Sequence, residues 1–324
     1  MREDLMTELE SEYEQIRSEN EQKEAARREK IRLEQPEIFA AMLEREHMIF
    51  GTLQDIVKGR ADTDNLPERM QALSDRIRAK LAEKGFPPDY LSPIYRCPVC
   101  RDTGKTGELI REPCVCLKKA YQRKLRERIG LSGEKAETFE TFDPYVFPDE
   151  KIPGQEFTQR ELMTHYRNTC EKWATTYPDA PYRDLILTGG TGLGKTFLLR
   201  AMADRLIERD VNVLIISAYR MLEILRKSYF DNDDTASETL NADVLMIDDV
   251  GSEPLMQNVT VEQLFNLLNE RQNRNLSTVI STNLDMAKFR ERYTERIASR
   301  LRGSRCKIIP MYGKDIRIGE SRKA

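Results

Sequence analysis

The chain has 324 residues, a length that corresponds to two or three domains. Hydrophobic residues make up 39% of the sequence, enough for at least one folded core, and the 33% of charged residues indicates long solvated helices. Because the net charge is only −3, any basic surface for nucleic acid must be local. No apolar stretch approaches the roughly 20 residues that span a membrane, and the polar start of the chain is not typical of a signal peptide. We therefore expect a cytoplasmic protein with no membrane segment.

The region before residue 86 is predicted to be helical. Residues 1–34 form one charged helix, whose apolar stripe over residues 5–16 fits either a solvated helix or an arm that pairs with a partner helix. Residues 36–59 and 67–85 form two more helices, each with a proline near its start and a glycine at its end. We expect the three helices to form a small bundle.

The next feature is a cluster of cysteines. Cys97 and Cys100 form a C-x-x-C turn, and Cys114 and Cys116 follow after a hairpin that is expected to turn near residues 104–107. In a reducing compartment such a cluster favours a metal over disulfides, and four thiolates suit tetrahedral Zn²⁺. An iron–sulfur cluster and a redox C-x-x-C pair are the alternatives. Zinc would be structural here, because a small domain gains folding energy from a metal.

Beyond the cysteines the pattern becomes that of an α/β protein. A basic helix (118–128) and a linker (131–155) lead into a region where strands and helices alternate, which predicts a parallel sheet with helices on both faces. We therefore divide the chain into a helical N-terminal domain (1–130), the linker, and a C-terminal domain (156–324). Aromatic residues of the linker should pack on the C-terminal domain: Phe139, Phe142, Tyr145 and Phe147. The predicted strands are 184–188, 211–217, 244–247, 278–282 and 307–310.

A phosphate-binding loop follows the first of these strands. Residues 189–196 fit the pattern G-x-x-x-x-G-K-[ST] between a strand and a helix, where loop N–H groups and the helix N-terminus bind phosphate. Lys195 would reach the β- and γ-phosphates, and Thr196 would offer its hydroxyl to Mg²⁺. No N-K-x-D segment for guanine is present, which favours ATP. The predicted nucleotide-binding residues are Gly189, Gly190, Thr191, Gly192, Leu193, Gly194, Lys195, Thr196 and Phe197.

Two later strands end in polar residues. The apolar strand 244–247 ends in Asp248 and Asp249, at the edge of the sheet where ligands bind. Asp248 is predicted to hold Mg²⁺ and Asp249 to polarise the attacking water, although Asp249 could instead only cap a turn. Many related motifs carry Glu at the second position, so the shorter Asp predicts slow hydrolysis. Asn283, after strand 278–282, is a candidate for holding the attacking water or the γ-phosphate, but Asn often caps strands.

Two basic clusters are candidates for further contacts. Arg296 and Arg300 lie along the last predicted helix, and an arginine there could stabilise transferred charge on a neighbouring subunit, or could simply end a helix favourably. Arg226 and Lys227 lie in a helix that mixes basic and aromatic residues, which suits single-stranded DNA, although most of its apolar residues fit a core.

With these elements in this order, the chain resembles the DnaC/DnaI family of replicative helicase loaders, within the AAA+ ATPases. The resemblance implies an AAA+ domain without a helical lid, single-stranded DNA binding, and Arg300 as an arginine finger. It also implies a zinc-bearing N-terminal region that grips a hexameric helicase of the DnaB type. No specific motif is recognised in the first 85 residues. The matching segments are 139–142, 189–197, 244–253, 281–284, 295–301 and 312–317.

We therefore predict a loader that uses ATP, Mg²⁺ and Zn²⁺ to place a replicative ring helicase on DNA, and that self-associates through its ATP site. One alternative is an IstB-like ATPase that assists a transposase, because such helpers share the same core. The other alternative is an adaptor that binds ATP without hydrolysing it.

Overall fold

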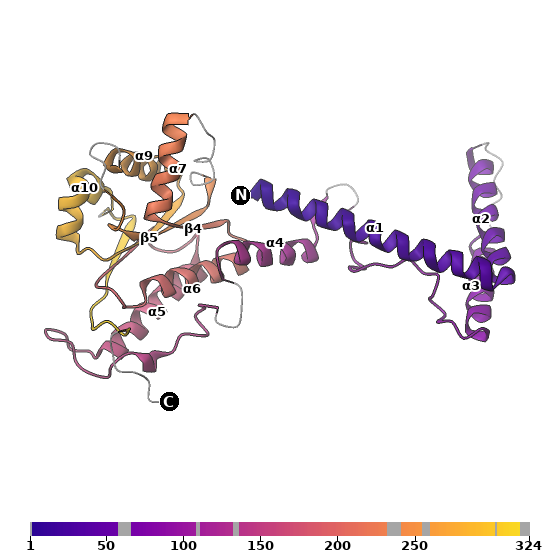
Figure 1. Cartoon of the computed structure of the whole chain (residues 1–324), viewed down its shortest axis with the longest axis horizontal. Helices are drawn as coiled ribbons and strands as arrows, with labels where there is room; N and C mark the ends of the chain where they lie inside the picture. The colour runs from indigo at the N-terminus through magenta and orange to yellow at the C-terminus, as the bar shows by residue number, and fades with distance from the viewer. Residues whose placement is uncertain are drawn as a thin grey trace. The chain divides into compact units, whose positions relative to one another are not determined.

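A computed structural model describes residues 2–57, 66–107, 111–131, 136–231, 241–254, 260–301 and 303–317. Side chains are described for these residues except at 2–3, 52–57 and 226–231. The chain divides into two compact units (Figure 1). The N-terminal unit comprises residues 6–117, and the C-terminal unit comprises residues 118–324 together with residues 1–5.

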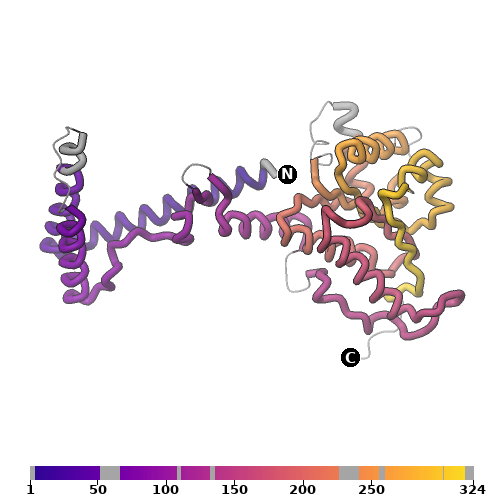
Figure 2. Tube along the Cα trace, turned by 180° about the vertical axis from the view of Figure 1, so that it is seen from behind, coloured from indigo at the N-terminus to yellow at the C-terminus, as the bar shows by residue number. Residues whose placement is uncertain are grey.

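The N-terminal unit contains one long helix and a helical pair. Most of α1 (Arg2–Glu34) lies in this unit, and α2 (Pro36–Val57) and α3 (Leu66–Glu83) run side by side (Figure 2). The predicted bundle therefore takes the form of a helical pair that packs only against the end of α1, because the middle of α1 is charged and has little to bury. The shared core consists of Ile31, Ile38, Ala41, Met42, Ile77 and Leu81.

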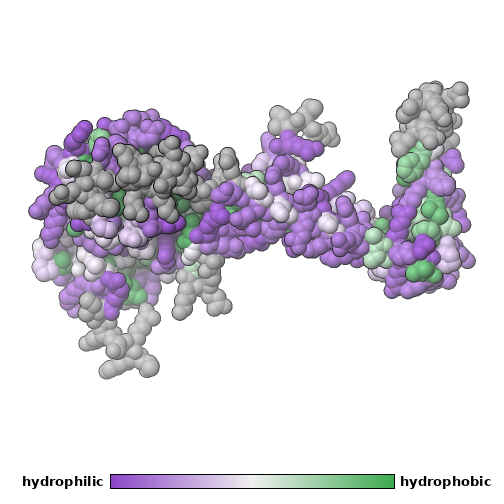
Figure 3. Space-filling view, turned by 45° about the horizontal axis from the view of Figure 1, so that its top comes forward, coloured by the Kyte–Doolittle hydropathy of each residue, from purple (hydrophilic) through white to green (hydrophobic). Residues whose placement is uncertain are grey.

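The helical pair keeps part of its apolar surface uncovered (Figure 3). Leu43 and Ile49 on α2 are more than one-third exposed, and Phe50 is 67% exposed. A large aromatic side chain with this exposure has no folding benefit where it stands, which makes the surface of α2 a candidate contact region.

Residues 13–24 of α1 lie along the cysteine region of the same unit. Arg17 donates from Nη1 to the carbonyl oxygen of Asp102 (3.0 Å), and the carboxylate of Glu24 accepts from the N–H of Ile94 (2.7 Å). Tyr13 packs against Gly104, where a Cβ atom would lie 3.5 Å from the Tyr13 ring. This face of α1 is therefore occupied by its own chain.

The C-terminal unit is built on a five-stranded sheet with the strand order β4–β5–β6–β3–β7. Every neighbouring pair of strands is parallel, which confirms the predicted sheet. The carboxyl ends of β3, β5 and β6 meet at one edge, where ligands bind in such sheets. The strands are β3 (Asp184–Thr188), β4 (Val213–Ser217), β5 (Val244–Val250), β6 (Ser277–Thr282) and β7 (Cys306–Pro310).

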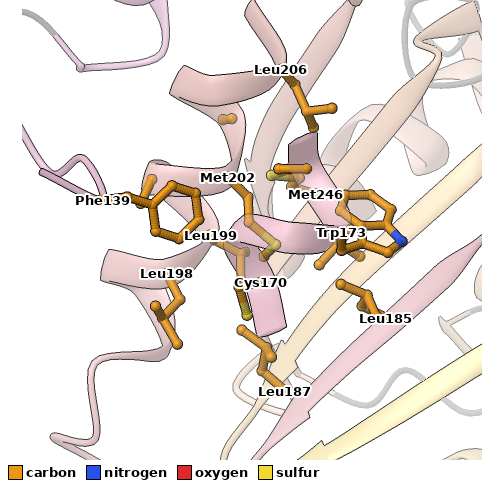
Figure 4. Close-up of a cluster of buried hydrophobic side chains, with 14 of the residues drawn as sticks. Phe139, Cys170, Trp173, Leu185, Leu187, Leu198, Leu199, Met202, Leu206 and Met246 are labelled. Atoms are coloured by element: carbon orange, nitrogen blue, oxygen red, sulfur yellow. The ribbon is translucent and has the colours of Figure 1, made fainter. Parts of the chain in front are cut away.

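Helices cover both faces of the sheet because its strands are apolar on both sides (Figure 1). On one face, Leu185 and Leu187 of β3 pack with Cys170 and Trp173 (Figure 4). Ile186 points to the opposite core. The first face is covered by α5 (Gln159–Thr176) and α6 (Lys195–Glu208), and the second by α7 (Ala218–Asp231), α9 (Thr260–Asn273) and α10 (Met286–Arg300).

The predicted linker and basic helix pack on the C-terminal unit. Phe139 and Phe147 are only 2% and 4% exposed and belong to the core that includes α5 and α6. Helix α4 (Val115–Arg128) is tied to the same unit by Arg126, whose Nε lies 2.6 Å from the carboxylate of Asp204. The compact units consequently divide at residue 117, whereas the sequence suggested a boundary at residue 130 and a linker to 155.

Among the described residues, no helix combines the length and the apolar character that a bilayer crossing requires.

Candidate nucleotide-binding site

The glycine-rich loop connects β3 to α6. Gly192 has a φ of 70°, and a Cβ atom there would lie 1.6 Å from Oδ1 of Asp315. Gly189 has a φ of 147°, and its Cβ would lie 2.3 Å from the carbonyl oxygen of Met311. Only glycine fits such positions, so the loop can curl while the segment after β7 packs against it. Since α6 begins at Lys195, the loop N–H groups gather at a helix N-terminus, which favours anions.

Lys195 is anchored within this loop. Its Nζ donates to the carbonyl oxygens of Gly189 (2.8 Å) and Gly190 (2.6 Å) and to Oδ1 of Asn283 (2.8 Å). Burial lowers the pKa of Lys195, while the carboxylates of Asp249 and Asp248 oppose that shift. An ammonium group with these acceptors can exchange them for phosphate oxygens, which form stronger charge-assisted hydrogen bonds.

Thr196 and Asp248 come together from α6 and β5. The Thr196 hydroxyl donates to Asp248, at 3.0 Å from Oδ2 and 3.2 Å from Oδ1. Ser281 on β6 also donates to Oδ1 of Asp248 (2.5 Å). A hydroxyl beside a carboxylate provides the hard oxygen ligands that Mg²⁺ prefers, and Mg²⁺ keeps several of its waters, so two protein ligands fit it.

Asn283 bridges the lysine and the second carboxylate. Its Nδ2 donates to Oδ1 of Asp249 (2.6 Å), while its Oδ1 accepts from Lys195. The N–H of Asp249 donates to the Ser281 hydroxyl (2.9 Å), and the backbone of Asp249 is left-handed, with a φ of 57°. The structure therefore brings the loop lysine, both carboxylates and the amide to one edge of the sheet.

These side chains line an open cavity of about 540 Å³. A volume of this size lies within the range of roughly 300–1,000 Å³ that is usual for ligand sites. No residue of α10 is among the described residues that line it. Its lining includes Thr191, Gly192, Leu193, Gly194, Lys195, Thr196, Phe197, Asp248, Asp249, Ser281 and Asn283.

A smaller apolar cavity of about 210 Å³ adjoins the first one. The two share Leu193, Gly194, Phe197 and Ile316 as lining residues. Aromatic residues of the predicted linker complete it: the Phe142 ring centroid lies 5.8 Å from those of Phe147 and Phe197. An apolar cavity beside a phosphate loop is suited to a planar nucleobase. The sequence did not suggest this role for these aromatic residues.

Sequence reasoning also missed Asp315 and Arg317. The segment after β7 crosses the loop, where the N–H of Ile316 donates to the carbonyl oxygen of Gly192 (3.2 Å). Arg317 lines the large cavity and pairs with Asp315 through Nη2 and Oδ2 (3.0 Å). Hydrogen bonds from Arg317 lower the pKa of Asp315 to about 2. Both residues lie in the segment 312–317, which the resemblance included, but no local pattern indicated contact with the loop.

The remaining arginine and lysine candidates lie elsewhere. Arg300 is exposed at the end of α10, with its guanidinium carbon 5.6 Å from the centroid of the Phe265 ring on α9. Arg296 contacts the same ring at 4.9 Å. Arg226 and Lys227 lie on α7, but their side chains are outside the described residues.

The clustered cysteines form a separate candidate metal centre within the N-terminal unit. The Sγ atoms of Cys97, Cys100, Cys114 and Cys116 all lie within 4.8 Å of one another. The Sγ atom of Cys100 lies 3.4 Å from that of Cys116, and the Sγ atom of Cys97 lies 3.9 Å from that of Cys114. Four sulfur atoms that converge in this way are compatible with one tetrahedral zinc ion.

The local fold explains the unusual C-x-C spacing. A hairpin is present, with β1 (Lys105–Thr106) antiparallel to β2 (Glu112–Pro113), so the chain reverses after Thr106, later than the predicted turn near residues 104–107. It returns the chain so that Cys114 precedes α4 and Cys116 lies in the first turn of this helix. Because Cys114 lies before the helix, its side chain is not restricted to helical spacing, and the two thiols separated by one residue face the same centre.

The surroundings of the clustered thiols differ. Backbone hydrogen bonds, chiefly at Cys100, lower the pKa of Cys97 to about 7, whereas burial raises the pKa of Cys100 and raises that of Cys116 to about 12. The hydroxyl of Tyr13 hydrogen-bonds the side chain of Cys116. The buried carboxylate of Asp102 accepts from the N–H of Cys97 (2.7 Å) and fixes the start of the turn. Contacts of this kind orient metal ligands.

The other two cysteines are different. Cys170 and Cys306 are buried in the C-terminal unit, and burial raises the pKa of each thiol to about 12. They are packing residues with little thiolate character.

The sheet, the phosphate loop and the paired carboxylates define an α/β domain of the P-loop type with a candidate nucleotide-binding site. Residues 173–324 match the family model of the IstB-like ATP binding protein. Over 116 residues the chain is 32% identical to the replicative helicase loader DnaI of Bacillus subtilis (strain 168). That match covers 35% of this chain and 37% of the relative, so it spans little more than a third of the relative's length. The predicted resemblance to loaders of the DnaC/DnaI type is thereby confirmed.

Solved structures of such proteins are also similar to this chain. The DnaC helicase loader has a TM-score of 0.46 and 20% identity, with 54% of this chain and 96% of that chain covered. A DnaI structure has a TM-score of 0.43 and 24% identity, with 56% of this chain and 90% of that chain covered.

Proposed function

We propose that this protein is an ATP-dependent loader of a replicative ring helicase onto DNA. The observation that carries the proposal is the bridged arrangement in which Asn283 joins Lys195 to Asp249 beside the Thr196–Asp248 pair. This arrangement provides a hydrogen-bond donor for phosphate oxygens, a position for a metal ion and a general base around one cavity. The similarity to a protein named as a replicative helicase loader supports loading as the use of this site.

Each residue has a role in this proposal. Residues 189–197 hold the phosphates, Lys195 contacts the β- and γ-phosphates, and the apolar cavity holds adenine. Thr196 and Asp248 hold Mg²⁺, which neutralises charge on the phosphates when bound. When Lys195 turns to a phosphate, Oδ1 of Asn283 becomes free to orient the attacking water, and Asp249 accepts its proton.

We infer that the N-terminal unit holds the helicase and that Cys97, Cys100, Cys114 and Cys116 bind a structural zinc ion. Arg226 and Lys227 are proposed to contact single-stranded DNA from α7. We place this activity in the cytoplasm, since none of the six cysteines forms a disulfide.

A second candidate function is that of an ATPase helper of a transposase. The match of residues 173–324 to the IstB-like family model favours it. Capture experiments with a DnaB-type helicase and with a transposase, each tagged and compared side by side, separate the two functions. Retention by the transposase alone would overturn the loader proposal. ATP turnover separates both from an adaptor that only binds ATP.

The exposed surface of α2 gives a sharper version of the capture experiment. We expect Phe50→Glu to weaken helicase binding at least about tenfold, because burying a phenylalanine contributes about 1.5–3 kcal/mol. Phe157→Glu is the matched control, since Phe157 is also exposed, at 53%, but belongs to the C-terminal unit. Titration by biolayer interferometry measures both. Equal affinities for the two variants would argue against α2 as the contact.

We further propose that Arg300 acts on ATP bound to a neighbouring subunit. Its exposure, and the lack of any α10 residue among the described lining of the large cavity, support action in trans. Arg300→Ala should lower ATP hydrolysis by about 10³–10⁵-fold where the finger acts fully, yet spare ATP binding. Lys288→Ala, at another exposed position on α10, is the control.

Mixing two defective variants tests this role directly. Lys195→Ala retains Arg300, and Arg300→Ala retains an intact phosphate loop. An interface between one subunit of each variant can therefore combine an intact loop with an intact Arg300. Partial recovery of hydrolysis is expected on mixing. If two folded, associating variants give no recovery, Arg300 is an ordinary cation at a helix end.

A further inference from the structure

The helix that carries Arg300 is broken near its middle. Within α10, Thr294 has a φ of 74° and a ψ of 158°, so two helical segments meet at a kink there. An L-residue rarely adopts such a conformation, which persists only where surrounding contacts impose it. The direction of the second segment, and with it the position of Arg300, therefore depends on what holds the residues beside the kink.

An ion pair between Arg290 Nε and Glu295 Oε2 (3.0 Å) spans the kink, and Glu253 holds the residues directly before it. Tyr293, directly before the kink, is fully buried, and its hydroxyl donates to the carboxylate of Glu253, which is 3% exposed. Arg292 donates from Nη2 to the carbonyl oxygen of Glu253, and its Nε lies 4.0 Å from the carboxylate. Burial and the neighbouring Glu253 raise the pKa of Tyr293, which keeps its hydroxyl a donor. A single buried acid thus fixes the last residues of the first segment.

Glu253 also belongs to the turn that follows Asp248 and Asp249. Its Oε2 accepts from the N–H of Gly251 (2.8 Å), and Ser252 donates from both N (3.2 Å) and Oγ (2.8 Å) to the carbonyl oxygen of Asp249. At Gly251, where φ is 111°, a Cβ atom would lie 2.8 Å from the side chain of Leu284, the residue after Asn283. The turn is therefore closely packed between the site residues and α10.

We infer that Glu253 is a positioning residue. It connects the ATP site of its own subunit with the position of Arg300 in the same subunit, and this Arg300 acts on ATP bound by the next subunit. This inference rests on the proposed trans action of Arg300. Asp249 and Asn283 face the cavity, Glu253 is joined to them by a short hydrogen-bonded turn, and Glu253 holds α10 just before the kink. Its effect falls on ATP bound by the neighbour and not on the ATP of its own subunit.

Glu253→Gln in the full chain tests the inference, because it keeps the shape of the side chain and removes its charge. The variant should bind ATP as the unaltered protein does, while its hydrolysis falls by about 100-fold, the loss expected when a catalytic group is misplaced by about 1 Å. Tyr293→Phe removes the same contact from the α10 side and should behave alike. Thermal unfolding verifies that both variants are folded.

Mixtures distinguish a misplaced finger from a damaged site. Glu253→Gln mixed with Lys195→Ala should recover hydrolysis. In the mixture, the well-placed Arg300 of a Lys195→Ala subunit can act on ATP bound by the intact phosphate loop of a Glu253→Gln subunit. Glu253→Gln mixed with Arg300→Ala should show no recovery, since neither variant supplies a well-placed finger. Any other pattern overturns the inference. Recovery with Arg300→Ala would place the defect in the variant's own site, and failure with both would mean a general defect.

The mixture of Lys195→Ala with Arg300→Ala is the reference. If it recovers hydrolysis while the Glu253 pattern fails, only the present inference falls. If the reference mixture does not recover hydrolysis, the proposed trans action of Arg300 is refuted, and this inference is refuted as well. Tyr293→Phe, run through the same mixtures, decides the matter if Glu253→Gln does not fold.

Discussion

Lys195→Ala is expected to abolish ATP-dependent activity while the fold is retained. The substitution removes the only group that donates to the carbonyl oxygens of Gly189 and Gly190 and to Asn283 within the described contacts, and with it the charge that a triphosphate would meet. Charged hydrogen bonds contribute about 1.5–3 kcal/mol each, so the loss of one corresponds to a decrease in affinity of about 10- to 150-fold. Turnover should fall below detection, because Lys195 is placed to stabilise the transferred phosphate.

Ligand-induced stabilisation measures this effect in the whole protein. A ligand at 100 times its Kd stabilises a folded protein by about 2.7 kcal/mol, so Mg²⁺-ATP should raise the unfolding temperature of the unaltered chain. Lys195→Ala should be stabilised much less at the same concentration, by about 0.3–1.4 kcal/mol for an affinity that is 10- to 150-fold weaker. Lys172→Ala, which changes an exposed lysine on α5, is the matched control and should respond normally. An unchanged response in Lys195→Ala would refute the nucleotide site.

Removing the clustered thiols should have the second large effect, confined to the N-terminal unit. Cys97→Ser combined with Cys114→Ser leaves two thiols for the metal, and structural zinc contributes about 10–16 kcal/mol to small zinc domains. We expect about one zinc per chain in the unaltered protein and none in the double variant. Without the ion, the contacts of Tyr13 and Arg17 with the cysteine region should loosen as well.

Elemental analysis and limited proteolysis test this expectation. Protein purified without added metal is analysed for zinc, and the double variant should be cleaved rapidly between residues 86 and 117. Cys306→Ala removes a thiol from β7 and should keep the full zinc content. Full zinc content in the double variant, or none in the unaltered protein, would contradict the zinc assignment. Iron in its place would indicate an iron–sulfur cluster.

The sequence predicted the C-terminal sheet well because its signals are local. Each strand is a short apolar run, and each polar tip directly follows its strand, so parallel order alone brings Lys195, Asp248 and Asn283 to one edge. Boundaries were less certain: β5 continues to Val250 through a register shift, beyond the apolar run that ends at Ile247.

Features that depend on distant contacts could not be predicted in this way. Nothing in the composition of residues 311–317 indicates that Asp315 presses against Gly192, because that contact depends on the path of the chain after β7. The kink at Thr294 was also missed, since its neighbours have ordinary helical periodicity and Glu253, which contacts the residue before it, lies far away in sequence. The role of Phe142 beside the loop was missed for the same reason.

The three acceptors of Lys195 have a consequence for how strongly a triphosphate can bind. Before a nucleotide binds, the ammonium is already satisfied, so an incoming triphosphate must displace internal partners before it gains its own. Binding therefore yields only the difference between the two sets of contacts. The carbonyl oxygens of Gly189 and Gly190 and the amide oxygen of Asn283 therefore offset part of the free energy that Lys195 contributes to binding a triphosphate.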